Sequence, residues 1–275
     1  MYSDSVSKSI FLKKNNMRHI FLLIIFVFAF QSGLAQKMTT ITYFANDTLQ
    51  LQLDLYLPKK KSKEKMPLVL FVHGGGFSGG ERQNGKNFCE FLSTNNFAAA
   101  TISYTLYMKG KKFSCDGLLS EKIKAFQFAA NDVWLATNHF ITYATTYNID
   151  ISKIFISGSS AGGEAVLHAA FWDSPSMALY DNMLPTDFKY AGLISGAGAI
   201  MDLNLITTKK LVPMFLFHGN GDTTVPYGTA AHHYCKPNAS GWLMLFGSHS
   251  IYEKVLAMHG SGSLYTFCGG GHEYS

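Results

Sequence analysis

Short apolar runs of strand length alternate along this 275-residue chain with longer segments of helical periodicity. Strands that alternate with helices indicate a mostly parallel sheet with helices on both faces. The run 68–72 is apolar without interruption, which is typical of a strand covered on both sides. We therefore predict one α/β domain. The predicted strands are 39–43, 49–56, 68–72, 97–104, 154–156, 190–194, 214–217 and 264–267, and the predicted helices are 121–147, 161–170 and 251–258.

The first two predicted strands are joined by a short turn at Asn46 and Asp47. Two strands linked in this way indicate an antiparallel pair. We therefore expect the parallel sheet to carry an antiparallel N-terminal edge.

Residues 20–30 form a run of eleven apolar residues, with basic residues before it and the small residues Gly33 and Ala35 after it. This order is the pattern of a signal peptide, and the run is shorter than the about 20 residues that span a bilayer. We expect residues 1–36 to be cleaved, 37–275 to form the α/β domain, and the protein to be secreted or periplasmic without a stable membrane span. An uncleaved anchor is the alternative. The true start, Met1 or Met17, stays open.

The charge balance gives no reason to expect a nucleic-acid partner. The formal net charge is +5, but without residues 1–36 the chain carries 19 basic and 17 acidic residues. Proteins that bind nucleic acid carry clustered basic stripes. The one dense basic run, 59–65, lies between two predicted strands, and we interpret it as a solvated hairpin loop.

The chain has four cysteines, which an exported protein can pair in three ways, and the sequence does not choose among them. There is no CxxC and no Cys/His spacing of a zinc site, so we predict no metal and no other cofactor. The adjacent His232 and His233 suit a surface helix better than a metal site. The cysteines are Cys89, Cys115, Cys235 and Cys268.

The glycine-rich stretch 73–80 fits the GxGxxG pattern of a dinucleotide site. That site needs a helix that starts at the loop and an acidic residue about 20 positions later. Here residues 81–84 precede any helix, and the strand 97–104 ends without an acid. The sequence therefore disfavours a dinucleotide site.

The pattern GxSxG occurs twice, and its context separates the two copies. The copy at 76–80 lies in the glycine-rich loop, whereas the copy at 158–162 follows the strand 154–156 and enters the helix 161–170. Strand–turn–helix is the context of a nucleophile elbow, because the turn exposes the serine hydroxyl and the helix N-terminus favours developing negative charge. Ser160 is therefore the candidate nucleophile.

A serine nucleophile needs a base and an acid that orients the base. Asp222 follows the strand 214–217 on a loop at its carboxyl end, where α/β sheets bind ligands. His272 follows the last strand and three glycines, whereas His168 lies within a helix and His249 flanks one. We therefore predict Asp222 as the acid and His272 as the base.

An elbow serine also needs an oxyanion hole, built by the N–H of the next residue and by an HGGG-type loop. Ala161 is that next residue, and Gly75 and Gly76 belong to such a loop. Glycine lets a substrate approach the backbone closely. We expect His73 to brace the loop rather than to act in catalysis.

Four motifs together resemble the α/β-hydrolase superfamily: HGGGF at 73–77, GSSAGG at 158–163, HGNGD at 218–222 and GGGH at 269–272. Within it the chain is similar to the carboxylesterase and acetyl-esterase group, which includes exported bacterial esterases. The resemblance covers the chain from about Leu51 to its end. It implies a serine esterase for short or aromatic acyl esters, including those on plant polysaccharides. The implied triad is Ser160, Asp222 and His272, and the implied oxyanion hole is Gly75, Gly76 and Ala161.

The chain departs from this group at two places. Relatives often carry an arginine after the tyrosine that ends the second parallel strand, where this chain has Thr105. Relatives also usually continue with a helix beyond the catalytic histidine, whereas only three residues follow His272. We expect either a fragment or a domain without its C-terminal helix.

The segment 173–189 is an irregular insertion between the elbow helix and the next strand. We expect it to cap the substrate pocket, with Phe77 and Trp172 as further pocket residues. Because the insertion is short, it favours a small acyl group over a long lipid chain.

Two other functions stay open. The HGNGD loop also resembles exported peptidases, so a serine peptidase or amidase of the same fold is one alternative. A non-catalytic binding protein on a hydrolase fold is the other. Activity on aminoacyl anilides separates the first from an esterase, and failure of a fluorophosphonate to label Ser160 favours the second. The sequence does not predict an oligomeric state.

Overall fold

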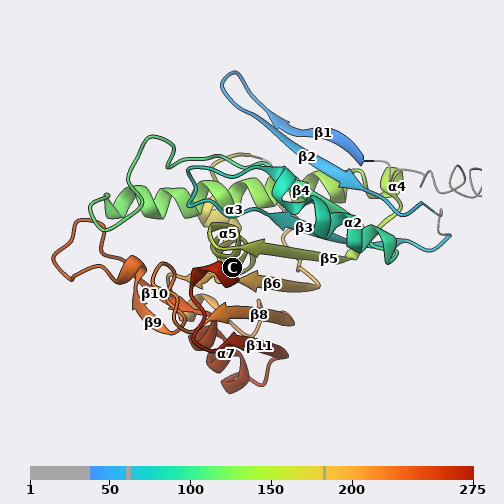
Figure 1. The fold of residues 1–275 in the computed structure, drawn as a ribbon. Helices are drawn as coiled ribbons and strands as arrows, with labels where there is room; N and C mark the ends of the chain where they lie inside the picture. The colour runs from blue at the N-terminus through green and yellow to red at the C-terminus, as the bar shows by residue number, and fades with distance from the viewer. Residues whose placement is uncertain (1–37, 60–62, 182–183) are drawn as a thin grey trace, which may run out of the picture. The chain divides into compact units, whose positions relative to one another are not determined.

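The computed structural model describes residues 38–59, 63–181 and 184–275, which contain an eight-stranded sheet (Figure 1). Strand β2 pairs antiparallel with β1 and β4, and the other neighbours pair in parallel. The predicted mostly parallel sheet with an antiparallel N-terminal edge is confirmed. In sheet order the strands are β1 (Met38–Ala45), β2 (Gln50–Tyr56), β4 (Ala98–Ile102), β3 (Met66–Val72), β5 (Ile149–Ser159), β6 (Gly192–Gly196), β8 (Met214–Gly219) and β11 (Gly262–Phe267).

Helices cover both faces of this sheet, as predicted. On one face, α2 (Lys86–Thr94) packs against β4 and buries Cys89. On the other face, α3 (Leu119–Thr142) and α5 (Ala161–Phe171) pack against each other over the principal apolar core, and α7 (Ser248–Ala257) packs against β11. Helix α2 is absent from the helices predicted above. The remaining short helices are α4 (Ala144–Tyr147) and α6 (Ser174–Met177).

A second, three-stranded antiparallel sheet lies outside the main one. It consists of β7 (Ala199–Ile200), β10 (Met244–Gly247) and β9 (Thr229–Ala231). These strands have two to four residues, which is too short for a sequence pattern to reveal them.

The basic segment 59–65 does not close a hairpin, so that part of the prediction is wrong. It connects β2 to β3, and these two strands do not pair because β4 lies between them. Its described residues are exposed to solvent.

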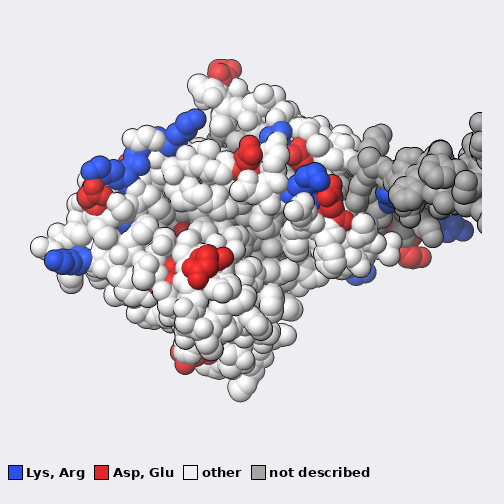
Figure 2. Space-filling model, viewed as in Figure 1, with Lys and Arg blue, Asp and Glu red and all other residues white. Residues whose placement is uncertain are grey.

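On the face shown in Figure 2, charged side chains are separated by broad areas without charge.

The parallel strands bring their carboxyl ends to one edge of the sheet. The loops after β3, β5, β8 and β11 all leave this edge. They carry the glycine-rich loop, Ser160, Asp222 and His272. The topology therefore gathers residues that lie up to about 200 positions apart in the sequence.

The predicted leader, 1–36, lies outside the described residues, so the domain boundaries and the export of the chain stay predictions. Across the described ranges, each helix lacks the length or the apolar character that crossing a bilayer requires.

Asp132 of α3 is buried beside Thr105. Its Oδ2 accepts a hydrogen bond from the N–H of Thr105 at 2.6 Å, and its Oδ1 has no partner among the described residues. Burial raises the pKa of this carboxyl to about 7, although the hydrogen bonds from Thr105 act in the opposite direction. No lysine or arginine in the described part of the chain pairs with this carboxyl, so burial favours the neutral acid.

We expect Asp132→Asn to be more stable than the wild type above about pH 7 and to lose that advantage near about pH 4. The unfolded carboxyl loses its proton near a pKa of about 3.9, whereas the folded one keeps it until about pH 7. The stability of the wild type therefore falls as the pH rises through this window, by about 4 kcal/mol. Urea unfolding across this pH range measures the difference. Glu253→Gln, at an exposed side chain, should keep the wild-type dependence, and a constant gap between Asp132→Asn and the wild type would refute the expectation.

Candidate active site

Ser160 occupies a strained turn between β5 and α5. Its backbone has φ 54° and ψ −122°, and its N–H donates to the carbonyl of Gly196 at 2.8 Å. Such a conformation is rare for a residue with a side chain and is found where the surrounding structure holds it. A Cβ on Gly158 would lie 2.1 Å from the carbonyl oxygen of Gly162, so only glycine fits there. The expected strand–turn–helix context is present.

The hydroxyl of Ser160 meets the imidazole of His272. The Oγ of Ser160 lies 2.8 Å from Nε2 of His272, which starts a short 3-10 turn after β11. The Nδ1 of the same ring lies 2.7 Å from Oδ2 of Asp222. The structure thus brings the three predicted residues into one hydrogen-bonded row.

The state of Asp222 decides the direction of these hydrogen bonds. Burial raises its pKa, but hydrogen bonds from His218, His272 and the N–H of Thr224 outweigh burial and hold the pKa well below its ordinary value. An ionised carboxylate only accepts hydrogen bonds, so Nδ1 of His272 carries the proton. Its Nε2 is then free to accept the proton of the Ser160 hydroxyl. This is the tautomer that a general base needs.

His218 is a supporting residue that the sequence analysis did not identify. It is buried, and its Nε2 lies 3.1 Å from Oδ2 of Asp222 and 3.2 Å from the carbonyl of Val225. Its Nδ1 lies 2.9 Å from Oγ of Ser248, which fixes the ring. The only sequence signal was its place four residues before Asp222 in the HGNGD motif.

The glycine-rich loop lies beside Ser160. A cavity of about 570 Å³ is lined by Gly74, Gly75 and Ser160 among others. The carbonyl of Gly75 accepts hydrogen bonds from the N–H groups of Ser78 and Gly79, and Gly75 and Gly76 both have positive φ. Among the described backbone groups, neither Gly75 nor Gly76 donates an N–H to a carbonyl. These N–H groups are therefore available to a ligand.

Ala161 is the first residue of α5, so its N–H has no partner within the helix. His73 is buried under the glycine-rich loop, with Nδ1 2.7 Å from the carbonyl of Gly74. The hydroxyl of Tyr104 donates to the carbonyl of His73 at 3.1 Å. These contacts fit the bracing role expected for His73.

Neither of the two predicted pocket residues is among those that line the cavity at Ser160. Phe77 is completely buried, with its ring edge-on to Phe113 and Phe126 at 5.1 and 5.4 Å, so it belongs to the core. Trp172 follows the last residue of α5, about 16 Å along the helix axis from its start. Helix α5 runs away from the edge of the sheet where the parallel strands have their carboxyl ends. The closeness of Trp172 to the elbow in sequence therefore does not place it near Ser160.

The described residues of the insertion 173–189 do not line this cavity either. Its described residues contact α3, where the side chains of Gln127 and Asn131 donate to the carbonyl of Met177. They also line a cavity of about 510 Å³ with Trp172 and with Tyr190 and Val212, which precede β6 and β8. One part of the insertion therefore packs against α3, and another part lies near the amino ends of β6 and β8.

The prediction of a surface helix at His232 and His233 is also wrong. His232 is buried, and both residues belong to a short 3-10 turn, His232–Tyr234. No group of three or more His, Cys, Asp or Glu side chains within the described ranges is arranged to hold a metal ion.

A model of the protein family BD-FAE matches residues 53–195, just over half of the chain. The match includes the glycine-rich loop and Ser160 and ends before Asp222. Arylacetamide deacetylase-like 2 of Homo sapiens is 27% identical over 146 residues, which cover 52% of this chain and 33% of that protein. Esterase-5B of Drosophila persimilis is 32% identical over 117 residues, which cover 42% and 20%. The chain thus spans a third or less of the length of these curated relatives.

Solved esterase structures share the fold. Thermogutta terrifontis esterase 2 with bound propionate superposes with a TM-score of 0.61 at 17% identity, over 87% of this chain and 85% of that one. The same esterase phosphoramylated by tabun gives a TM-score of 0.60 at 19% identity, over 86% and 84%. At these identities the likeness establishes the α/β-hydrolase architecture.

Proposed function

The chain belongs to the BD-FAE family of α/β-hydrolase proteins, and we propose that it is a serine esterase whose catalytic triad is Ser160, His272 and Asp222. One observation carries this proposal: Oγ of Ser160, the two ring nitrogens of His272 and Oδ2 of Asp222 form a continuous row with contacts of 2.8 and 2.7 Å. Nucleophile, base and orienting acid stand in the order that acyl transfer requires.

In the proposed mechanism, Oγ of Ser160 attacks the ester carbonyl while Nε2 of His272 takes the hydroxyl proton. The N–H groups of Gly75, Gly76 and Ala161 donate hydrogen bonds to the carbonyl oxygen and stabilise the negative charge that develops on it. His272 then gives its proton to the leaving alcohol, which leaves an acyl group on Ser160. Water, activated by the same imidazole, attacks the acyl group and restores the serine. Asp222 stays ionised and stabilises the imidazolium form of His272.

We assign short acyl esters as the substrate class, with acetyl groups on polysaccharides as a natural source. The propionate and butyrate complexes of the Thermogutta esterase support a short acyl group in this fold. Secretion or a periplasmic location, through cleavage of residues 1–36, would bring the enzyme to such substrates.

A substrate panel tests this function. We expect hydrolysis of p-nitrophenyl acetate, propionate and butyrate, with release of acetate from acetylated xylan, and at least about 100-fold lower kcat/KM for the octanoate ester and for aminoacyl anilides. Faster cleavage of the anilides would show a peptidase or amidase instead. The absence of turnover on every substrate, with a folded protein, would favour a non-catalytic binding protein.

A further inference from the structure

The turn His232–Tyr234 has a strained backbone. His233 and Tyr234 both have positive φ, 56° and 51°. Consecutive non-glycine residues in this region are uncommon, and they persist where neighbouring structure holds them in place. The contacts that hold this turn therefore identify what it is built to position.

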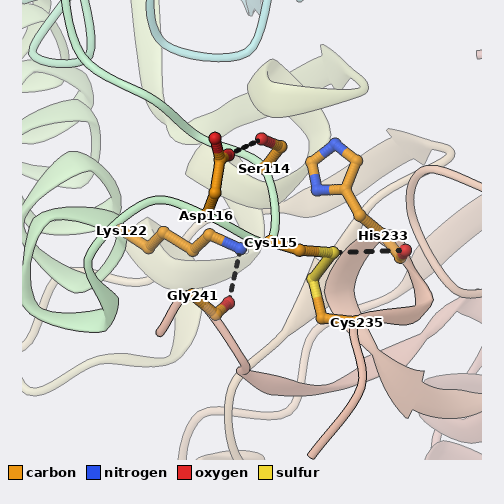
Figure 3. The surroundings of a disulfide bond; sticks show 7 residues. All are labelled: Ser114, Cys115, Asp116, Lys122, His233, Cys235 and Gly241. Atoms are coloured by element: carbon orange, nitrogen blue, oxygen red, sulfur yellow. Dashed lines mark hydrogen bonds between the residues drawn. A yellow bond between two sulfur atoms is a disulfide. The ribbon is translucent and has the colours of Figure 1, made fainter. Parts of the chain in front are cut away.

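A disulfide holds one end of the turn. Cys235, the next residue, is bonded to Cys115, 120 positions earlier (Figure 3). The segment around Cys115 is itself fixed, because its carbonyl accepts the N–H of Gly241 at 2.9 Å. The buried ammonium group of Lys122 in turn donates to the carbonyl of Gly241 at 2.7 Å (Figure 3). The disulfide thus ties the turn to the start of α3.

The middle of the turn is bonded to the loop that carries Asp222. The N–H of His233 donates to the carbonyl of Thr224 at 2.9 Å. The N–H of Thr224 donates to Oδ1 of Asp222 at 2.7 Å. A displacement of the turn would therefore move Thr224, and through Thr224 the carboxylate of Asp222.

The first residue of the turn contacts the helix that follows the nucleophile. Nε2 of His232 lies 3.6 Å from Oε1 of Glu164, and both side chains are buried. The N–H of Glu164 donates to the carbonyl of Ser160 at 2.9 Å. Burial raises the pKa of Glu164 and lowers that of His232, so burial favours the neutral form of both groups over an ion pair.

We infer that the disulfide-anchored turn is a brace that sets Ser160 and Asp222 at their working separation, with His232 as a positioning residue. This inference rests on the proposed esterase function. Because a misplacement of about 1 Å can cost about 100-fold in rate, loosening the brace should lower kcat and leave KM nearly unchanged. The ring of Phe113 lies between the turn and the glycine-rich loop, at 5.0 Å from His232 and 5.1 Å from Phe77, whereas no hydrogen bond among the described residues joins the turn to Gly75 or Gly76.

Removal of the disulfide is the first test. We expect Cys115→Ala with Cys235→Ala to lower kcat for p-nitrophenyl acetate by about 10- to 100-fold, with KM within about twofold. The matched control is Cys89→Ala with Cys268→Ala, which removes the two free cysteines and should keep wild-type kcat. Assays run at a temperature where circular dichroism shows every variant folded. Equal kcat in the two double variants would overturn the inference.

Substitution of His232 is the second test and leaves the disulfide in place. We expect His232→Ala to lower kcat by about 10-fold or more, and His232→Gln, which keeps a polar side chain of similar reach, to restore it to within about threefold. A role in stability alone would change the melting temperature without this rescue of kcat. Equal kcat for His232→Ala and the wild type would contradict a positioning role.

Hydrogen exchange separates failure of the brace from failure of the esterase proposal. We expect the amides of Thr224 and Val225, which donate to Asp222, to exchange at least about 10-fold faster without the disulfide. This readout needs no substrate. If the wild type hydrolyses no ester, the proposed function fails, and the exchange rates of these two amides alone test whether the turn acts as a brace. Unchanged exchange at both amides would overturn the brace in either case.

Discussion

Ser160→Ala is expected to lower kcat for p-nitrophenyl acetate by about 10⁵-fold or more while leaving the protein folded. The alanine removes Oγ, which is the atom 2.8 Å from Nε2 of His272, and no described side chain stands in the same row to replace it. Residual hydrolysis would come from the oxyanion site and substrate binding alone. The measurement is a steady-state assay of both proteins, with melting temperatures compared in the same buffer.

Ser78→Ala is the informative comparison, because Ser78 lies in the other GxSxG copy. Its hydroxyl donates to the carbonyl of Gly75 at 3.2 Å, and no imidazole of the described residues forms a hydrogen bond with it. We expect its loss to cost less than about 10-fold in kcat, as for a single weak hydrogen bond. A larger loss in Ser78→Ala than in Ser160→Ala would show that the nucleophile lies in the copy at 76–80 and not in the copy at 158–162.

Asp222→Asn is expected to have the second largest effect, about 10³- to 10⁴-fold in kcat with little change in KM. The side-chain amide keeps the shape but is neutral, and it can direct an N–H at Nδ1 of His272. The ring would then carry its proton on Nε2 and could not accept the proton of Ser160. Rates measured under saturating substrate test this result.

Asp202→Asn is the matched control for that substitution. Asp202 is exposed and caps the 3-10 turn Leu203–Leu205, where its side chain accepts the N–H of Asn204 at 2.8 Å. We expect wild-type kcat in this variant. If Asp222→Asn retained more than about a tenth of the activity, the acid of the triad would have to be another carboxylate.

The sequence predicted the parts of the site that local structure decides. The elbow at Ser160 is fixed by the strand before it, the helix after it and the glycines between them, and all of these are neighbours in sequence. Asp222 and His272 were predictable because each follows a strand, and the parallel topology brings the carboxyl ends of strands to one edge. Such rules need only strand order and connection.

The errors concern long-range packing. Trp172 stands next to the elbow helix in sequence, yet the length of α5 separates it from Ser160. Phe77 follows Gly75 and Gly76, the proposed oxyanion glycines, but its ring packs against three aromatic neighbours in the core. His232 is buried because the turn is held by Cys115, which lies more than 100 residues earlier. None of these partners leaves a periodic signal in the sequence.

Labelling with a fluorophosphonate, followed by mass spectrometry, tests the central claim most directly. The reagent reacts with a serine only when a base activates it and an oxyanion site accepts the developing charge. We expect one adduct per chain, on the peptide that contains Ser160, with its rate of formation sharply lower in Asp222→Asn. A folded wild type that takes up no reagent, or takes it up on another residue while still hydrolysing esters, would contradict the assignment of Ser160 as the nucleophile.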